Sequence, residues 1–363
     1  MDKPALEALL TASGGRVDAA EALRLAHAAA AAPKGRRPDA WVDLIAAAPT
    51  ADQRAALAAL RIQATELLED GLDAPPPPTA LRARIEAARD AMIARGYDGF
   101  LIPRSDAHQS EMVARRDQRL AWAFGFTGSA GLGVLLRERC VLFVDGRYGV
   151  QARMETDGDS VEIVVGESRS ASDWLRRHAP RGTRIAYDPW LHPPAALTPL
   201  AEACEAAGAR LEPAGDNPVD AAWAGRAERP IHPVRRHPDA HAGRSAEDKR
   251  RQIAATVSTD GADAVVLTDP ASIAWLLNVR GGDLPFTPLP LAFAILTADA
   301  RVELFTDPRK FDPVRDALGD AVAVAEWSAF GPALDRLGRE GGAPRGVRVD
   351  HKSAPDWVFQ RLA

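Results

Sequence analysis

Cysteine is scarce in this sequence, with only Cys140 and Cys204 among 363 residues. The two lie in different segments and form neither a metal-binding nor a redox spacing. This excludes a disulfide framework and a cysteine-based zinc site. Two cysteines in a chain of this length suit a reducing compartment, and we expect both to be small buried apolar residues.

Long apolar runs and a basic surplus are also missing. No run of about 18 apolar residues occurs, so we expect no membrane span. The N-terminal stretch MDKPALEALL lacks the basic region and long apolar core of a secretory signal. The formal net charge is −5, whereas nucleic-acid binding needs a clustered basic surplus. We therefore expect a cytoplasmic protein that binds neither a membrane nor a nucleic acid.

The most informative segment is residues 122–148, WAFGFTGSAGLGVLLRERCVLFVDGRY. Two apolar runs, at 133–136 and 140–144, flank the polar turn at 137–139. Runs of this length around a charged turn predict a β-hairpin with at least one buried face. The glycines between Gly125 and Gly131 indicate a backbone that turns sharply or is closely approached.

The first 74 residues predict a separate helical segment. They are rich in Ala and Leu at helical spacing and are interrupted by Gly and Pro clusters. This pattern predicts about four short helices, with Asp18, Asp39 and Thr50 as N-caps. Four consecutive prolines, Pro75 to Pro78, then predict a stiff extended linker over 75–79.

Residues 80–216 predict a first α/β domain. An amphipathic helix from Leu81 to Gly96 is followed by a strand at 98–103 and then by the hairpin. Further strands are predicted at 161–165 and 184–188, with a helix around Trp174 between them. Alternation of helices and strands is typical of a layered α/β structure. Residues 217–242, rich in Pro, His and Arg, predict a linker wrapped on a surface.

The pattern recurs in residues 243–363, which predict a second α/β domain. Its elements are a helix at 249–260, apolar strands at 263–267, 291–296, 302–306 and 346–350, and a short helix at 273–278. The order of elements matches that of the first domain. In this alignment Asp98 is equivalent to Asp263, Trp122 to Trp275, and Asp145 to Asp307. Two α/β domains of the same plan are therefore expected. The tryptophans Trp122, Trp223 and Trp275 have apolar neighbours and are expected in the core.

Five ordered motifs resemble the long, three-domain Xaa-Pro aminopeptidases (aminopeptidase P), in the region that these share with creatinase and prolidase. The motifs are PRSDAHQSE at 103–111, RLAWAFGFTGSAG at 119–131, DGRY at 145–148, VDAAW at 219–223 with Arg226 and ERP at 228–230, and IAWLLNVRGGD at 273–283. The resemblance covers roughly residues 79–363 and departs from the family pattern at 284–290. It implies two creatinase-N-like α/β domains with mixed sheets after a small all-α segment.

The resemblance also implies what this chain does not supply. The family's catalytic third domain has a pita-bread fold and binds two divalent metals such as Mn²⁺ through two Asp, a His and two Glu. No such set is found here, so we predict no catalytic residue, no metal and no cofactor in this chain, which alone is expected to be inactive. Asp106 and Asp117 share the spacing of the first two ligands, but their surroundings match the first-domain loop.

Arg147 is the leading candidate for a substrate-side contact. It follows a buried strand on a glycine-assisted turn, and an arginine there can present a rigid bidentate donor. In relatives, the matching arginine approaches the peptidase active site. The alternative is a structural arginine paired with Asp145. Asp106 and His108 are second candidates, for which hydrogen bonds that stabilise their loop are the alternative.

The sequence therefore predicts the non-catalytic N-terminal domains of an Xaa-Pro aminopeptidase-like protein. In the family these domains restrict access to a dinuclear metal exopeptidase and contribute to dimerisation. A homodimer is expected, and a peptide substrate only through the missing catalytic domain. The alternative function is a stand-alone, non-catalytic oligomerisation or regulatory binding module. A fragment of a longer gene product is a further alternative.

Overall fold

The computed structural model describes residues 3–12, 17, 22, 25–26, 42–46, 49–51, 53–57 and 78–363, without 167–169, 285 and 340–345. Internal contacts divide the chain into two units, Met1–Pro75 and Pro76–Ala363. No helix among the described residues is long and apolar enough to cross a membrane.

The N-terminal unit is helical where it is described. It includes α1 (Lys3–Ala12) and α3 (Val42–Ile45), and its small apolar core contains Leu6, Val42 and Leu57. Thr50 caps the helical turn that follows it, since its Oγ1 accepts a hydrogen bond from Gln53 N (3.2 Å) and its own N–H donates to Gln53 Oε1 (2.9 Å). This reciprocal pair is a capping box. The other two expected N-caps, Asp18 and Asp39, lie outside the described residues, as do Pro75 to Pro77.

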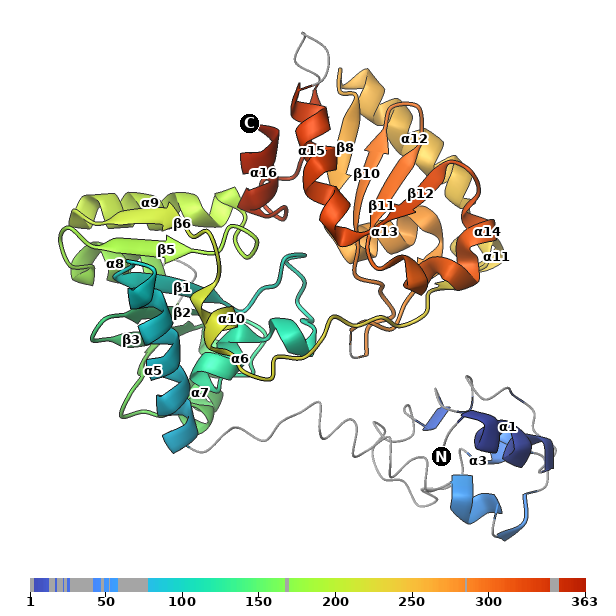
Figure 1. The fold of residues 1–363 in the computed structure, drawn as a ribbon, viewed down its shortest axis with the longest axis horizontal. Coiled ribbons are helices and arrows are strands. Elements are labelled where there is room, and N and C mark those ends of the chain that lie inside the picture. The colour runs from blue at the N-terminus through green and yellow to red at the C-terminus, as the bar shows by residue number, and fades with distance from the viewer. Residues whose placement is uncertain are drawn as a thin grey trace. The chain divides into compact units, whose positions relative to one another are not determined.

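The second unit begins with a six-stranded α/β domain (Figure 1). Its elements are α5 (Pro78–Ala94), β1 (Gly99–Pro103), η1 (Arg115–Asp117), α6 (Arg119–Phe124), β2 (Gly131–Leu136), β3 (Cys140–Val144), η2 (Gly146–Tyr148), α7 (Gly149–Glu155), β4 (Glu162–Val165), α8 (Ser170–His178), β5 (Arg184–Tyr187), α9 (Pro194–Ala207) and β6 (Arg210–Pro213). Helix α5 starts at the last of the four prolines, since proline fits the first turn of a helix. The predicted linker therefore loses its last two residues to this helix.

The sheet is mixed, with strand order β4-β3-β2-β1-β5-β6. Strand β2 pairs antiparallel with both β1 and β3, so the hairpin predicted from the glycine-rich segment is confirmed. The outer pairings, β3 with β4, β1 with β5 and β5 with β6, are parallel. Cys140 on β3 and Cys204 on α9 are both free and buried, as expected.

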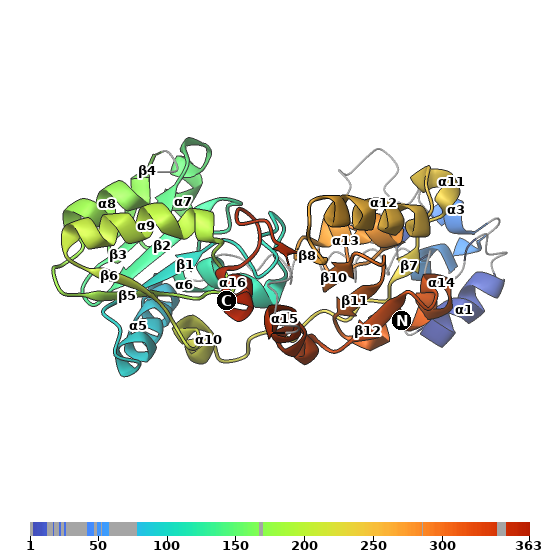
Figure 2. The same cartoon turned by 90° about the horizontal axis from the view of Figure 1, so that it is seen from above.

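Successive residues of the central strands face opposite layers of helices, as the strand period requires. Phe100 and Ile102 of β1 pack in the layer that contains α5 and α6, whereas Leu101 packs in the layer of α8 and α9. Figure 2 shows α8 and α9 on one side of this sheet and α5 on the other.

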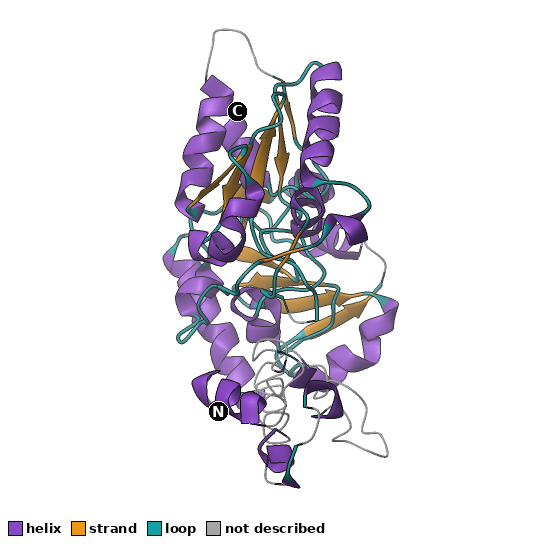
Figure 3. Cartoon of the chain, turned by 90° about the vertical axis from the view of Figure 1, so that its right-hand side faces the viewer, coloured by secondary structure: helices purple, strands orange, loops and turns teal. Residues whose placement is uncertain are grey.

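The second α/β domain repeats this plan with a five-stranded sheet, and β9 (Val279–Arg280) pairs separately with β7 (Arg235–Arg236). Its elements are α12 (Ala246–Thr259), β8 (Ala264–Leu267), α13 (Pro270–Leu277), β9 (Val279–Arg280), β10 (Phe293–Thr297), β11 (Val302–Phe305), η3 (Pro308–Val314), α14 (Arg315–Leu318), β12 (Val322–Ala325), η4 (Trp327–Ala329), α15 (Phe330–Arg339), β13 (Val347–Arg348) and α16 (Asp356–Leu362). The strand order is β12-β11-β10-β8-β13, and the directions match those of the first sheet. Helices flank these strands on both sides (Figure 3).

Matched residues confirm the internal repeat. The backbone N–H of Asp98 donates to Arg184 O (2.8 Å), and that of Asp263 donates to Gly346 O (2.7 Å), ahead of the equivalent strands β1 and β8. Trp122 and Trp275 lie on the equivalent helices α6 and α13. The expectation of a core position is wrong for Trp275, which is 48% exposed. It lies under the Lys249 ammonium, 4.6 Å from the ring centroid.

The segment between the domains is more ordered than a surface linker. It contains α10 (Pro218–Ala222), β7 (Arg235–Arg236) and α11 (Asp239–Ala242). Strand β7 pairs antiparallel with β9, and Val219 and Val234 are buried. Two apolar residues of this predicted linker therefore anchor it to the two domain cores.

Candidate functional site

Arg147 lies in a tight turn directly after β3. Asp145 caps η2, with its Oδ1 accepting a hydrogen bond from Arg147 N (2.9 Å). The same carboxylate pairs with the guanidinium at 2.7 Å, and the hydrogen bonds from Arg147 lower the pKa of Asp145. The Arg147 side chain is nevertheless 68% exposed. It is therefore paired within its own turn and open to solvent at the same time.

An equivalent turn occurs in the second domain. Arg309 N donates to Asp307 Oδ1 at 3.0 Å, and its guanidinium pairs with the same side chain at 2.5 Å. The pairing is thus a product of the Asp-x-Arg turn itself. What differs is the residue that follows: Tyr148 lies 5.1 Å under the Arg147 guanidinium, whereas Lys310 is buried.

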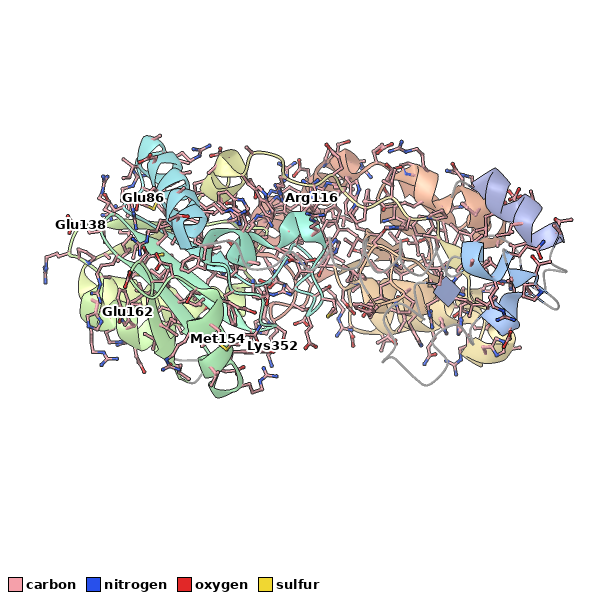
Figure 4. The ribbon with its side chains drawn as sticks, turned by 90° about the horizontal axis from the view of Figure 1, so that it is seen from below. Glu86, Arg116, Glu138, Met154, Glu162 and Lys352 are labelled. Carbon is pink, nitrogen blue, oxygen red and sulfur yellow. The ribbon has the colours of Figure 1, made fainter. Side chains whose placement is uncertain are left out.

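Two exposed apolar side chains lie on α7, the helix that follows the Arg147 turn. Val150 and Met154, one helical turn apart on α7, are 72% and 79% exposed. Residues four apart on a helix lie on the same face. We call Arg147, Val150 and Met154 the α7 face; Figure 4 shows Met154 at the surface of the first domain.

Asp106 is buried in the loop that follows β1, with 1% of its surface exposed. Its Oδ1 accepts hydrogen bonds from the backbone N–H groups of His108 (2.9 Å) and Ser110 (3.2 Å). Its Oδ2 has no hydrogen-bond partner among the described residues. Burial raises the pKa of this carboxyl above its ordinary value. These contacts fold the loop.

His108 joins the two α/β domains. Its Nδ1 lies 3.0 Å from Thr268 O, at the end of β8, and its ring stacks on Phe293 with 4.5 Å between centroids. Because a carbonyl oxygen only accepts, Nδ1 carries the proton of a neutral imidazole. Burial lowers the pKa of His108, which keeps the ring neutral.

The contact between the domains continues around Trp190, in the loop after β5. Its ring stacks on Trp357 of α16 with 3.8 Å between centroids. Tyr187 Oη donates to Asp356 Oδ2 (2.7 Å), and the N–H of Asp356 donates to His192 O (2.8 Å). Burial lowers the pKa of His192 to about 4. Aromatic stacking and these hydrogen bonds hold α16 against the first domain.

A cavity of about 380 Å³ lies in this contact region. Its wall combines charged and aromatic side chains from the first domain, the connecting segment and the second domain. The lining residues are Ala107, His108, Arg116, Asp117, Arg119, Asp188, Trp190, Leu191, Asp220, Arg226, Arg229, Pro230, Leu291, Phe293, Trp327 and Ser328.

Two arginines and two aspartates form an ion-pair network on one wall of this cavity. Arg119 holds Asp220 through two hydrogen bonds (2.7 and 2.9 Å) and also reaches Asp117 (3.2 Å). Arg226 pairs with both carboxylates, at 2.5 Å to Asp220 and 3.0 Å to Asp117. Burial alone would lower the pKa of Arg119, but pairing with Asp220 outweighs it and raises that pKa. The network ties α6 to the connecting segment.

The sequence did not reveal this cavity as a site. Arg119, Asp220, Arg226 and Arg229 all occur in the recognised motifs, where they carried no assigned role. The one available signal is the presence of charged residues in two motifs about a hundred positions apart. Only the fold brings Arg119 and Asp220, 101 positions apart, into contact. The structure places His108 at this cavity, and Arg147 is not among its lining residues.

No group of three or more His, Cys, Asp or Glu side chains in the described part of the chain is arranged to hold a metal ion. Asp117 is engaged with arginines, and Asp106 accepts backbone hydrogen bonds.

Two matches to one family description cover most of the chain. Residues 84–219 and residues 225–363 each match a model described as a creatinase/prolidase N-terminal domain. The chain belongs to this family. The two matches coincide with the two α/β domains, so the repeat seen in the strand order is a tandem of creatinase-N domains.

Curated relatives of the chain are named as probable Xaa-Pro aminopeptidases P. The protein of Coccidioides posadasii (strain RMSCC 757 / Silveira) is 34% identical over 264 residues, which are 72% of this chain and 43% of that protein. The protein of Ajellomyces dermatitidis is 31% identical over 257 residues, 70% of this chain and 42% of its own length. The chain thus spans less than half the length of these relatives.

A solved structure shares the fold. The X-prolyl aminopeptidase of Caenorhabditis elegans, described as a cytosolic enzyme with a di-nuclear active site, superposes with a TM-score of 0.73. The match covers 78% of this chain and 48% of the nematode enzyme, at 24% identity. The creatinase-N-like α/β fold expected from the sequence is confirmed.

Proposed function

We propose that this chain supplies the non-catalytic, creatinase-N part of an Xaa-Pro aminopeptidase-like protein. In that role its two domains narrow the approach to a dinuclear metal centre and help form a homodimer. The names of its relatives supply the peptidase and, for the nematode enzyme, the di-nuclear active site, whereas the narrowing role and the homodimer follow from the family resemblance. The catalytic groups would lie in the portion of such proteins outside the match, and we assign no metal ligand to this chain.

The observation that carries the proposal is the exposed α7 face. Val150 and Met154 are 72% and 79% exposed, although apolar side chains of this size are ordinarily buried. Arg147, on the preceding turn, has a 68% exposed side chain beside them. Apolar residues around a central arginine are typical of protein interfaces. A docked catalytic domain or a second copy of the chain would cover this face.

In this arrangement Arg147 would bind the peptide substrate and would not stabilise the fold. Its guanidinium keeps its charge at all working pH values and presents several N–H donors. Asp145 accepts hydrogen bonds from Nε and Nη2 of the guanidinium, and the side chain remains 68% exposed. Such a donor, placed at the edge of an active site, would orient a substrate carbonyl or carboxylate and so favour a productive geometry.

A stand-alone oligomerisation or regulatory module is the second candidate. The same exposed α7 face favours it, since an apolar face suits a protein partner whether or not that partner is catalytic. The two candidates differ in whether the face binds a peptidase domain.

A binding experiment between this chain and a separate peptidase portion distinguishes the two candidate functions. The chain would be titrated with the purified part of the Coccidioides posadasii relative that lies beyond the match, and complex formation followed by light scattering after size exclusion. We expect a complex that Met154→Asp abolishes and Ile231→Asp, an exposed control in the connecting segment, leaves intact. Self-association without binding of the peptidase part would favour the stand-alone module instead.

A further inference from the structure

We propose that the cavity between the two α/β domains binds a small organic anion, a carboxylate or phosphate carried on a flat apolar group. Arg116 and Arg229 would hold the anionic end, and the aromatic wall would hold the apolar end. This inference goes beyond the proposed function and does not depend on it.

The charges around the cavity do not balance. Four arginines line it, namely Arg116, Arg119, Arg226 and Arg229, against the three aspartates Asp117, Asp188 and Asp220. The third aspartate, Asp188, is engaged by neutral donors: its oxygens accept hydrogen bonds from Asn217 Nδ2 of the connecting segment (2.8 Å) and from Trp190 N of its own loop (2.9 Å). A positive charge is therefore left over at the cavity.

In the described part of the chain, the two arginines without a close carboxylate partner are Arg116 and Arg229. Asp117 and Asp220 are engaged by Arg119 and Arg226, and Arg116 reaches Asp117 only at 3.8 Å. Among the residues that the structure describes, Arg229 has no ion-pair partner. Loss of hydration lowers the pKa of Arg116, which marks a cation that an anion would stabilise. Figure 4 shows Arg116 beside the second domain.

Another part of the cavity lining is apolar and aromatic. Leu191, Leu291 and Phe293 are buried at the cavity, and Trp190 and Trp327 complete this part of the lining. Arg229 lies over the Trp327 ring, with its Cζ 4.9 Å from the centroid. A cation–π contact thus holds the guanidinium over this ring, and no hydrogen-bond partner of its N–H groups occurs among the described residues.

The lining also defines how a ligand enters and how large it can be. Arg229 and Ser328 are exposed and form the mouth, whereas His108 and Phe293 are buried deeper. Because the imidazole of His108 is neutral, it adds no second charge inside. A volume of about 380 Å³ lies at the lower end of the range of small-molecule sites, roughly 300–1,000 Å³. Carboxylates and phosphates each present two oxygens that a guanidinium can bind through two parallel N–H groups.

Calorimetric titration of the full chain with four probes tests this inference: benzoate, phenyl phosphate, inorganic phosphate and the cation benzylamine. We expect saturable one-to-one binding of benzoate or phenyl phosphate, weaker binding of inorganic phosphate, and none of benzylamine. Arg229→Gln should weaken binding roughly tenfold or more, the loss expected for one charge-assisted hydrogen bond. Arg251→Gln, an exposed arginine on α12, is the matched control.

Two further variants separate ligand binding from folding. Trp327→Leu should remove the advantage of phenyl phosphate over inorganic phosphate and leave the binding of inorganic phosphate in place. Arg116→Lys keeps the charge but removes the fork, and should weaken binding while melting at the wild-type temperature. The inference is overturned if neither organic anion saturates the chain below about 10 mM, or if Arg229→Gln and Arg251→Gln weaken binding equally. Equal affinity for phenyl phosphate and inorganic phosphate would overturn the aromatic half of the proposal.

Discussion

Lys310 Nζ lies 2.5 Å from Asp283 Oδ2, and both side chains are completely buried. Lys310 also donates to Leu291 O (2.6 Å), while Asp283 Oδ2 accepts from Leu291 N (2.7 Å). The backbone N–H of His232 donates to the other carboxylate oxygen (3.2 Å). One ion pair therefore fixes the connecting segment, the loop before β10 and η3 together.

Breaking this pair should destabilise the fold strongly. Asp283→Ala leaves a buried ammonium without a counter-charge, a change that costs about 3–5 kcal/mol in such pairs. Asp299→Ala is the control, because Asp299 is 65% exposed and 3.6 Å from Arg301; exposed pairs contribute about 0–1 kcal/mol. Urea unfolding measures both free energies. Similar losses for the two variants would show that the buried pair does not hold the segments together.

Acid should weaken the contact between the domains. His192 is 3% exposed, and burial lowers its pKa to about 4 from the ordinary histidine value of 6.5. A lowered histidine pKa means that the fold prefers the neutral ring, so its stabilisation is complete above pH 6.5 and is lost as the pH falls toward 4. The shift corresponds to about 3 kcal/mol at most. Burial lowers the pKa of His108 as well, which adds to the loss in the same direction.

The measurement is the free energy of unfolding between pH 7.5 and pH 4.5. His192→Gln should flatten the pH dependence, whereas His351→Gln, at an exposed position, should leave it as in the wild type. If the free energy of unfolding of His192→Gln depends on pH as in the wild type, other groups cause the acid sensitivity.

Arg147→Ala should change the melting temperature little, because the side chain is exposed and its one ion-pair partner among the described residues is Asp145. Arg309→Ala is a matched control, with the same turn and the same pairing in the second domain. In a protein that carries the peptidase portion, Arg147→Ala should lower kcat/KM and Arg309→Ala should not. A large loss of stability in Arg147→Ala alone would make Arg147 a structural residue.

Removal of residues 1–75 should leave residues 76–363 folded. The two units separate by their internal contacts between Pro75 and Pro76, and the apolar core of the first unit is its own. Thermal melting of the shortened chain should match the main transition of the full chain. A drop of several degrees would show that the helical unit supports the α/β domains.

Much of the fold could be predicted from local patterns. The hairpin of β2 and β3 was predicted from two apolar runs around a charged turn. The equivalent positions of Asp145 and Asp307 in the two halves helped to reveal the repeat. Helix α9 was missed, and Pro199 lies inside it, where a proline usually argues against a helix. Strand β12 was also missed, because four residues are too few to show a clear alternation of apolar and polar side chains.

The site was harder to predict, because its contacts are distant in sequence. His108 contacts Thr268, 160 positions later, and Arg119 contacts Asp220, 101 positions later. No local period encodes such pairs. Trp275 shows that a local pattern can also mislead. Its apolar neighbours in sequence predicted a core position, but its side chain is exposed on the surface of the helix. For Arg147 the turn could be predicted, while its role stays a prediction.

The measurement that tests the central claim most directly is release of the N-terminal residue from an Xaa-Pro peptide in the presence of Mn²⁺. Three samples would be compared at equal concentration: this chain, the unmatched portion of the Coccidioides posadasii relative, and a fusion that joins residues 76–363 to that portion. We predict turnover by the fusion, much less by the relative's portion alone, and none by this chain. Metal-dependent turnover by this chain alone, or a folded fusion no more active than the portion alone, would contradict the account.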